Sequence, residues 1–100
     1  MFSGGDYHEV ARWLENFANS HAKREDPRAE RVLSAGGPRE GVSYGVRVRL
    51  DERLSSEIEL QFADVARDRG GMAWCQHLAD RARGLAREAR AAASGLPRPA

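Results

Sequence analysis

Two short stretches of alternating apolar and polar residues constrain this chain more than any other feature. In residues 42–50 every second residue is apolar, and the residues between them are serine, glycine or arginine. Residues 57–63 alternate in the same way, with Ile58 and Leu60 separated by polar side chains. A period of two is typical of a strand that buries one face. The two stretches therefore predict an antiparallel hairpin that residues 51–56 close.

A register for this hairpin follows from matching both of its faces. Placing Val48 opposite Ile58 also puts Arg49 opposite Glu57, and the same agreement continues along both strands. Apolar side chains then meet apolar ones and cations meet anions, in pairs that contribute about 0.2–1 kcal/mol each. A slip by one residue would turn the apolar set toward water. We therefore predict one core-forming face and one charge-paired outer face.

Helical periodicity flanks the hairpin on both sides. In residues 7–24 apolar side chains recur every three or four positions, and Asp6 followed by Glu9 fits a capping box. Pro27 ends this helix, because the residue before a proline avoids the helical conformation. Residues 72–93 carry a second apolar stripe that is rich in alanine. The sequence thus predicts one helix before the hairpin and one after it.

The predicted fold is a small α+β domain over residues 1–93, in which both helices pack on one face of a small antiparallel sheet. One hundred residues provide for a single domain with a modest core. Residues 29–34 fit either a further helical turn or a third strand. Residues 64–69 are predicted to be a polar connector. Residues 94–100 contain glycine and proline and are predicted to be a flexible tail.

Composition and charge bear on several classes of function. Sixteen Lys and Arg residues against fifteen Asp and Glu residues give a net charge of +1, whereas non-specific nucleic-acid binding usually needs a clear basic excess. With a single cysteine the chain can form neither an internal disulfide nor a thiolate metal cluster. No apolar run approaches the ~20 residues that span a membrane, and no signal peptide is visible. We therefore expect a cytoplasmic protein without cofactor or metal and without membrane contact.

The residues that could carry chemistry do not form a recognisable catalytic set. Cys75 is near the start of the last helix, but His77, two residues later, points to another side of it. We therefore expect Cys75 to be a buried structural thiol. His77 and Asp80 could touch, but spacing identifies no third ligand of the kind that a catalytic metal needs. His21 falls on an apolar stripe and is expected at the edge of the core.

Some basic and flexible residues are candidate contacts for nucleic acid or another anion. Three arginines of the last helix recur at helical spacing, and such a stripe can lie along phosphates. Two glycines precede the same helix, whose free N–H groups could bind an anion, although the spacing is not that of a P-loop. The candidate residues are Arg67, Arg69, Gly70, Gly71, Arg83, Arg87 and Arg90. The competing interpretations are a solvated arginine face and a plain hinge.

The lack of a convergent catalytic or metal-binding set favours a small non-enzymatic protein-interaction module, such as an adaptor, an inhibitor or a subunit. Exposed sheet edges are commonly covered by another chain, so we expect self-association, for example as a homodimer. Trp13 and Trp74 are expected in the core, and either would anchor an interface if it lay at the rim. Two alternatives stay open. One is a nucleic-acid-binding domain that uses the arginine stripe, and the other is a small enzyme with an unrecognised site.

Overall fold

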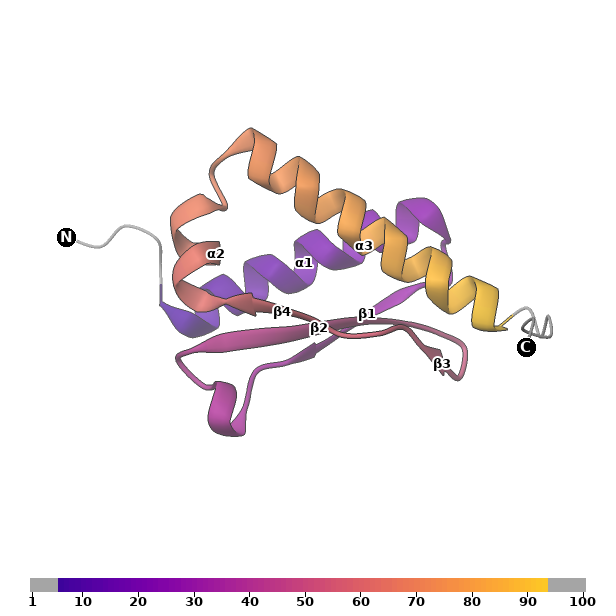
Figure 1. Cartoon of the computed structure of the whole chain (residues 1–100), viewed down its shortest axis with the longest axis horizontal. Helices are drawn as coiled ribbons and strands as arrows, with labels where there is room; N and C mark the ends of the chain where they lie inside the picture. The colour runs from indigo at the N-terminus through magenta and orange to yellow at the C-terminus, as the bar shows by residue number, and fades with distance from the viewer. Residues whose placement is uncertain (1–5, 94–100) are drawn as a thin grey trace.

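A four-stranded antiparallel sheet and the helices on one of its faces make up the fold in the computed structural model (Figure 1), which describes residues 6–93. In chain order, the elements are α1 (Tyr7–Glu25), β1 (Glu30–Ser34), the 3-10 helix η1 (Gly37–Arg39), β2 (Ser43–Leu50), β3 (Arg53–Leu54), β4 (Ile58–Gln61), α2 (Phe62–Asp68) and α3 (Met72–Ala93). The α+β fold class, both predicted helices and the third strand at residues 30–34 are confirmed. The predicted tail lies outside the described residues.

Helix α1 begins and ends where its sequence predicts. The side chain of Asp6 accepts a hydrogen bond from the backbone N–H of Glu9 at 2.8 Å, and the side chain of Glu9 accepts one from the N–H of Asp6 at 3.3 Å. This reciprocal pair is a complete capping box. At the other end Asp26 has extended backbone angles before Pro27. Local sequence alone therefore sets both boundaries of α1.

Strand β2 is the centre of the sheet, with β1 on one side and both β3 and β4 on the other. Its alternate residues Tyr44, Val46, Val48 and Leu50 point toward the helices and are at most 2% exposed. The predicted core-forming face is therefore confirmed along β2. Val42 was expected on the same face but is 57% exposed, because it precedes the strand.

The register between β2 and β4 differs by two residues from the predicted one. Val46, rather than Val48, lies opposite Ile58. Since side chains alternate with a period of two, this slip leaves every residue on its predicted face. It does change the charge pairs, because Glu57 now lies 3.6 Å from Arg47.

Two local features cause this difference in register. Asp51, with a φ of 56°, and Glu52 form a tight turn between β2 and β3, where a six-residue loop was expected. Between the β2–β3 and β2–β4 pairings, the second strand then carries one residue more than β2. This extra residue is a bulge at Ser55 and Ser56. The sequence prediction treated the whole segment as loop and so missed both features.

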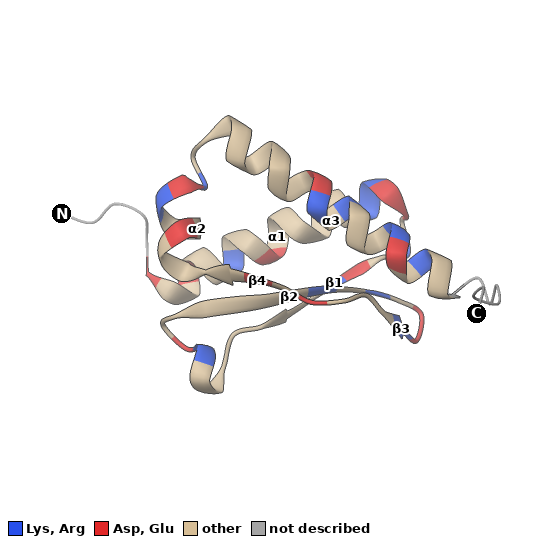
Figure 2. Cartoon of the chain, in the orientation of Figure 1, with Lys and Arg blue, Asp and Glu red and all other residues tan. Residues whose placement is uncertain are grey.

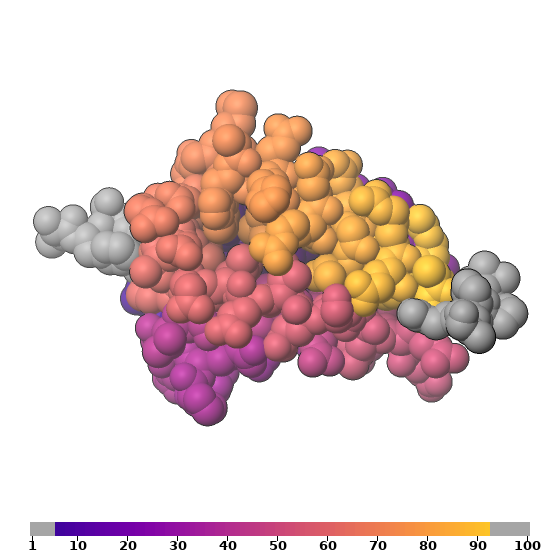
Figure 3. All heavy atoms as spheres, viewed as in Figure 1, coloured from indigo at the N-terminus to yellow at the C-terminus, as the bar shows by residue number. Residues whose placement is uncertain are grey.

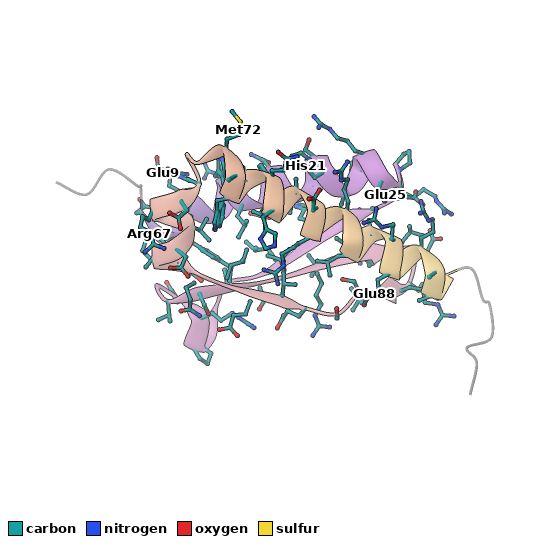
Figure 4. All side chains as sticks on the ribbon, turned by 45° about the horizontal axis from the view of Figure 1, so that its top comes forward. Glu9, His21, Glu25, Arg67, Met72 and Glu88 are labelled. Atoms are coloured by element: carbon teal, nitrogen blue, oxygen red, sulfur yellow. The ribbon has the colours of Figure 1, made fainter. Side chains whose placement is uncertain are left out.

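Side chains satisfy the backbone at the bulge. Ser55 donates its N–H to the carbonyl of Val48 and accepts the N–H of Val48 on its hydroxyl, both at 2.9 Å. The backbone N–H and the hydroxyl of Ser56 both donate to the carboxylate of Glu88, which reaches over from α3 (Figure 4). The bulge is therefore fixed partly by a helix that comes much later in the chain.

Residues 62–68 form helix α2, where the end of a strand and a polar connector were predicted. The N–H of Phe62 donates to the carbonyl of Val42 at 2.8 Å, beyond the first residue of β2. In the observed register Phe62 lies opposite Val42, just outside β2, and the chain turns there into a helix that buries Val65 and Ala66. The stretch is too short for its periodicity to stand out from the sequence.

Candidate interaction surface

Helices α1 and α3 lie side by side on the sheet and run in the same direction (Figure 1). Near their beginnings, the rings of Trp13 and Trp74 have centroids 6.3 Å apart. Near their ends, the carboxylate of Glu25 accepts hydrogen bonds from Arg87 and Arg90, each at 3.0 Å. The two helices therefore share one continuous seam.

An open groove of about 340 Å³ lies along this seam. Its apolar lining includes Phe17, Cys75 and Ala79. At one end Met72 is 84% exposed, and its side chain stands clear of the ribbon in Figure 4. The orange start of α3, where Met72 lies, projects from the surface in Figure 3. The groove therefore has an apolar floor and an exposed apolar side chain beside it. The remaining lining residues are His21, Arg24, Gln76, Asp80 and Arg83.

A row of aromatic rings continues from the floor of the groove to its end. The ring centroids of Trp13 and Phe17 are 4.9 Å apart, and those of Phe17 and His21 are 4.5 Å apart. Trp13 and Trp74 are both half-buried and pack against the core. The guanidinium of Arg69 lies over the Trp13 ring, 5.9 Å from its centroid. The two tryptophans thus pack against the core, and Trp13 also stacks on Phe17 of the groove lining.

The polar rim of the groove carries a positive excess. Arg83 is paired with Asp80 at 2.9 Å, whereas Arg24 has no ion pair or hydrogen bond within the described part of the chain. Burial, together with the positive charges of Arg24 and Arg83, lowers the pKa of His21 below its usual value. By contrast, the first two turns of α3 carry no charged side chain (Figure 2). The groove therefore combines an uncharged stretch at the start of α3, an Asp80–Arg83 ion pair and the unpaired Arg24.

The predicted arginine stripe of α3 points toward carboxylates of the protein itself. Arg87 and Arg90 share Glu25, whose side chain is only 19% exposed. Arg90 also donates to the backbone carbonyl of Glu25 at 3.1 Å. Arg83 lies beside Asp80 in the next turn of the same helix. Two of these arginines thus hold α3 against the end of α1, and the third is paired on its own helix.

The predicted anion-binding joint is packed between α2 and α3. Arg67 is paired with Asp64 at 3.1 Å and with Asp68 at 2.9 Å. The N–H of Gly71 donates to the carbonyl of Asp68 at 2.8 Å, and the carbonyl of Gly71 accepts the N–H of Cys75. The backbone of Gly71 is therefore already engaged in connecting the two helices.

Cys75 is half-buried in the groove wall, where the sequence predicted a buried structural thiol. Its thiol donates to the backbone carbonyl of Arg69 at 3.1 Å. Among the described residues, no three His, Cys, Asp or Glu side chains come close enough together to hold a metal ion. Over the same residues, none of the helices has the length and apolar character needed to cross a membrane.

Comparison of the chain with known protein families, with curated proteins and with solved structures finds no match. Of the residues that line the groove, the sequence indicated Arg83 as a candidate contact, but it identified neither Arg24 nor the groove itself. One signal was available, namely the uncharged run of residues 72–79 that starts with a methionine directly after two glycines. Whether the side chains of this run are buried depends on which helix packs against them. The spacing of residues in the sequence does not reveal which helix that is.

Proposed function

We propose that this chain is a non-enzymatic protein-interaction module whose α1–α3 groove binds a protein segment with an apolar side chain beside a carboxylate. The observation that carries the proposal is the apolar floor of the groove next to Met72, which is 84% exposed, and the unpaired Arg24. Exposed apolar side chains that gather beside a groove, with polar groups around them, are typical of protein-binding sites.

The shape of the groove favours a helix or a short extended segment as the ligand. Two helices form its walls, and grooves of this kind accept the apolar face of an amphipathic helix. Half-buried aromatic rings at one end, among them Trp13 and Trp74, resemble the residue types that dominate binding energy at interfaces. Methionine beside them adapts its shape to different apolar partners.

The charge of the groove favours an acidic ligand. Arg24 is exposed and unpaired, and Arg83 contacts one exposed carboxylate, that of Asp80, at 2.9 Å. A carboxylate on the ligand would pair with Arg24 without breaking a contact inside the protein. A phosphate backbone on the α3 stripe, in contrast, would compete with Glu25 for Arg87 and Arg90. These contacts favour a protein ligand over the nucleic-acid alternative.

A pair of synthetic helical peptides tests this proposal. The Leu/Glu peptide has leucine on one face and glutamate elsewhere, and the Leu/Lys peptide replaces each glutamate with lysine. Trp13 stacks on Phe17 of the groove lining, and its ring centroid is 6.3 Å from that of Trp74, so binding to the dilute protein can be followed by tryptophan fluorescence. We expect the Leu/Glu peptide to bind at least about tenfold more tightly than the Leu/Lys peptide, a difference of about 1.4 kcal/mol.

A charge reversal shows whether the peptide occupies the groove. Arg24→Glu should abolish the preference for the Leu/Glu peptide. Arg53→Glu is the matched control, because Arg53 is an exposed arginine of β3 outside the groove lining, and this variant should bind like the parent chain. Equal binding of both peptides, binding of neither, or an unchanged preference in Arg24→Glu would contradict the proposal.

A further inference from the structure

We infer that the ligand of the α1–α3 groove is a second copy of this chain, in a symmetric dimer. This inference rests on the proposed function and names the partner for the same groove. A two-fold symmetric interface uses the same surface on both subunits, so that surface must be complementary to itself. The groove meets this requirement in shape, and it holds both a cation, Arg24, and an exposed carboxylate, Asp80.

The shape requirement is met because a projection and a hollow lie next to each other. Met72 is 84% exposed at the start of α3, and the groove of about 340 Å³ opens beside it. A methionine side chain is long, flexible and apolar, and it packs well against aromatic rings. Each copy can therefore supply one projecting side chain and one hollow.

The direction of the two helices determines which residues would meet. Because α1 and α3 run in the same direction, a two-fold axis along the seam lays α1 of each copy over α3 of the other. Trp13 pairs with Trp74 at the end of the seam where Met72 begins α3. Met72 of one copy then faces Trp13 and Phe17 of the second copy, which are half-buried and stacked at 4.9 Å.

The same axis brings opposite charges together. Arg24 of each copy then faces α3 of the other, where Asp80 and its ion-pair partner Arg83 both line the groove and the Asp80 side chain is 59% exposed. Arg24 has no partner of its own in the described part of the chain, so the dimer would supply one to each copy. Two equivalent Arg24–Asp80 contacts would follow from the symmetry.

The sheet offers a weaker surface for self-association than the groove. Both edge strands are short, since β1 has five residues and β4 has four, and short edges resist pairing with another chain. Within residues 6–93, the other large exposed apolar residues are Val42, just before β2, and Leu54, in β3. A stable dimer covers about 800 Å² on each partner, which is about an eighth of the 6303 Å² surface of the chain.

Sedimentation velocity over a range of protein concentrations tests the dimer directly. We expect the parent chain to approach twice its mass of 11.1 kDa as its concentration rises. Met72→Glu should stay monomeric, because it places a carboxylate at the projecting position. Val42→Glu is the matched control with the same new charge at another exposed apolar position, and it should still dimerise. A monomeric parent chain, or equal effects of both substitutions, would overturn the inference.

An exchange of charges tests the proposed symmetry. Arg24→Asp and Asp80→Arg should each weaken the dimer at least about tenfold, because each puts like charges face to face. The double variant Arg24→Asp/Asp80→Arg should regain dimerisation, since it restores opposite charges in exchanged positions. Unchanged dimerisation in either single variant, or no recovery in the double variant, would contradict this arrangement.

The two proposals fail in different ways. The peptide titration uses dilute protein, so it reports on the groove whether or not the chain dimerises at higher concentration. A chain that stays monomeric but binds the Leu/Glu peptide would disprove the second copy and leave the interaction module standing. A chain that does neither would disprove both.

Discussion

The two parts of α3 differ in what surrounds them. The first part, residues 72–79, carries no Asp, Glu, Lys or Arg, buries Leu78 and Ala79, and leaves Met72 exposed beside the groove. The second part buries Leu85, Ala86 and Ala89 and has polar side chains bound to α1 and to the hairpin. The polar contacts that fix α3 to α1 and to the hairpin therefore lie in its second part, whereas its first residue, Met72, is left exposed.

The two parts of α3 should differ most in how much the free energy of unfolding falls when an apolar side chain in each is replaced by alanine. Leu85→Ala should lower the free energy of unfolding by about 2–5 kcal/mol, because it removes a buried side chain and leaves a cavity. Met72→Ala should change the same quantity by less than about 0.5 kcal/mol, as exposed positions usually do. Urea denaturation measures both, and similar losses in the two variants would refute the contrast.

A smaller effect should follow from removing the carboxylate that joins α1 to the second part of α3. Glu25→Gln weakens the contacts to Arg87 and Arg90, but it also relieves a negative charge at the C-terminus of α1, which favours the substitution by about 0.3–1 kcal/mol. We expect a net loss of about 1 kcal/mol in the free energy of unfolding.

Asp80→Asn is the control for the contacts of Glu25 with Arg87 and Arg90, because Asp80 and Arg83 form an exposed ion pair within one helix. Such a pair contributes about 0.3–0.5 kcal/mol. Added salt should reduce the effects of both substitutions. If Glu25→Gln lowers the free energy of unfolding no more than Asp80→Asn does, the contacts of Glu25 add nothing to stability beyond an exposed ion pair.

The smallest effect should be the pH dependence that His21 confers from the groove wall. Its pKa is lowered in the folded chain by burial and by Arg24 and Arg83, so the unfolded chain binds more protons in this range. Stability should therefore fall as the pH drops below about 6.5, the usual histidine value. His21→Gln should flatten this slope in thermal or urea unfolding between neutral and mildly acidic pH.

His77→Gln controls for the loss of an imidazole, because His77 is exposed on α3. We expect this variant to retain the slope that His21→Gln removes. An identical slope in the parent chain and in His21→Gln would mean that the groove wall does not couple to stability through this side chain.

Most of the architecture could be predicted because it depends on local or periodic signals. The capping box at Asp6 and Glu9 and the proline at position 27 fixed α1, and the alternation along β2 fixed the face that the helices cover. The register and α2 could not be predicted in this way. They depend on a turn at Asp51 and a bulge at Ser55, whose geometry the polar composition of the segment does not reveal.

For the candidate site, the sequence predicted which residues share a helix face, but not how the two helices pack against each other. The sequence placed Trp13, Phe17 and His21 on one stripe and Trp74 and Cys75 on another, but it contained no signal for how the two stripes meet. The arginine stripe illustrates the same limit, since its partner Glu25 is more than sixty positions away from Arg90 in the chain. Contacts between distant segments decide which charges stay free and which surface stays open.

The contact between Glu88 and the bulge has a consequence for the alignment of the hairpin. Two registers of the hairpin, two residues apart, bury the same apolar side chains, so apolar burial alone does not distinguish between them. The Asp51 turn and the bonds of Ser55 to Val48 favour the observed register locally, and the carboxylate of Glu88 adds two bonds to Ser56 in that register. We therefore expect the hairpin to hold its alignment more firmly once α3 has docked on it.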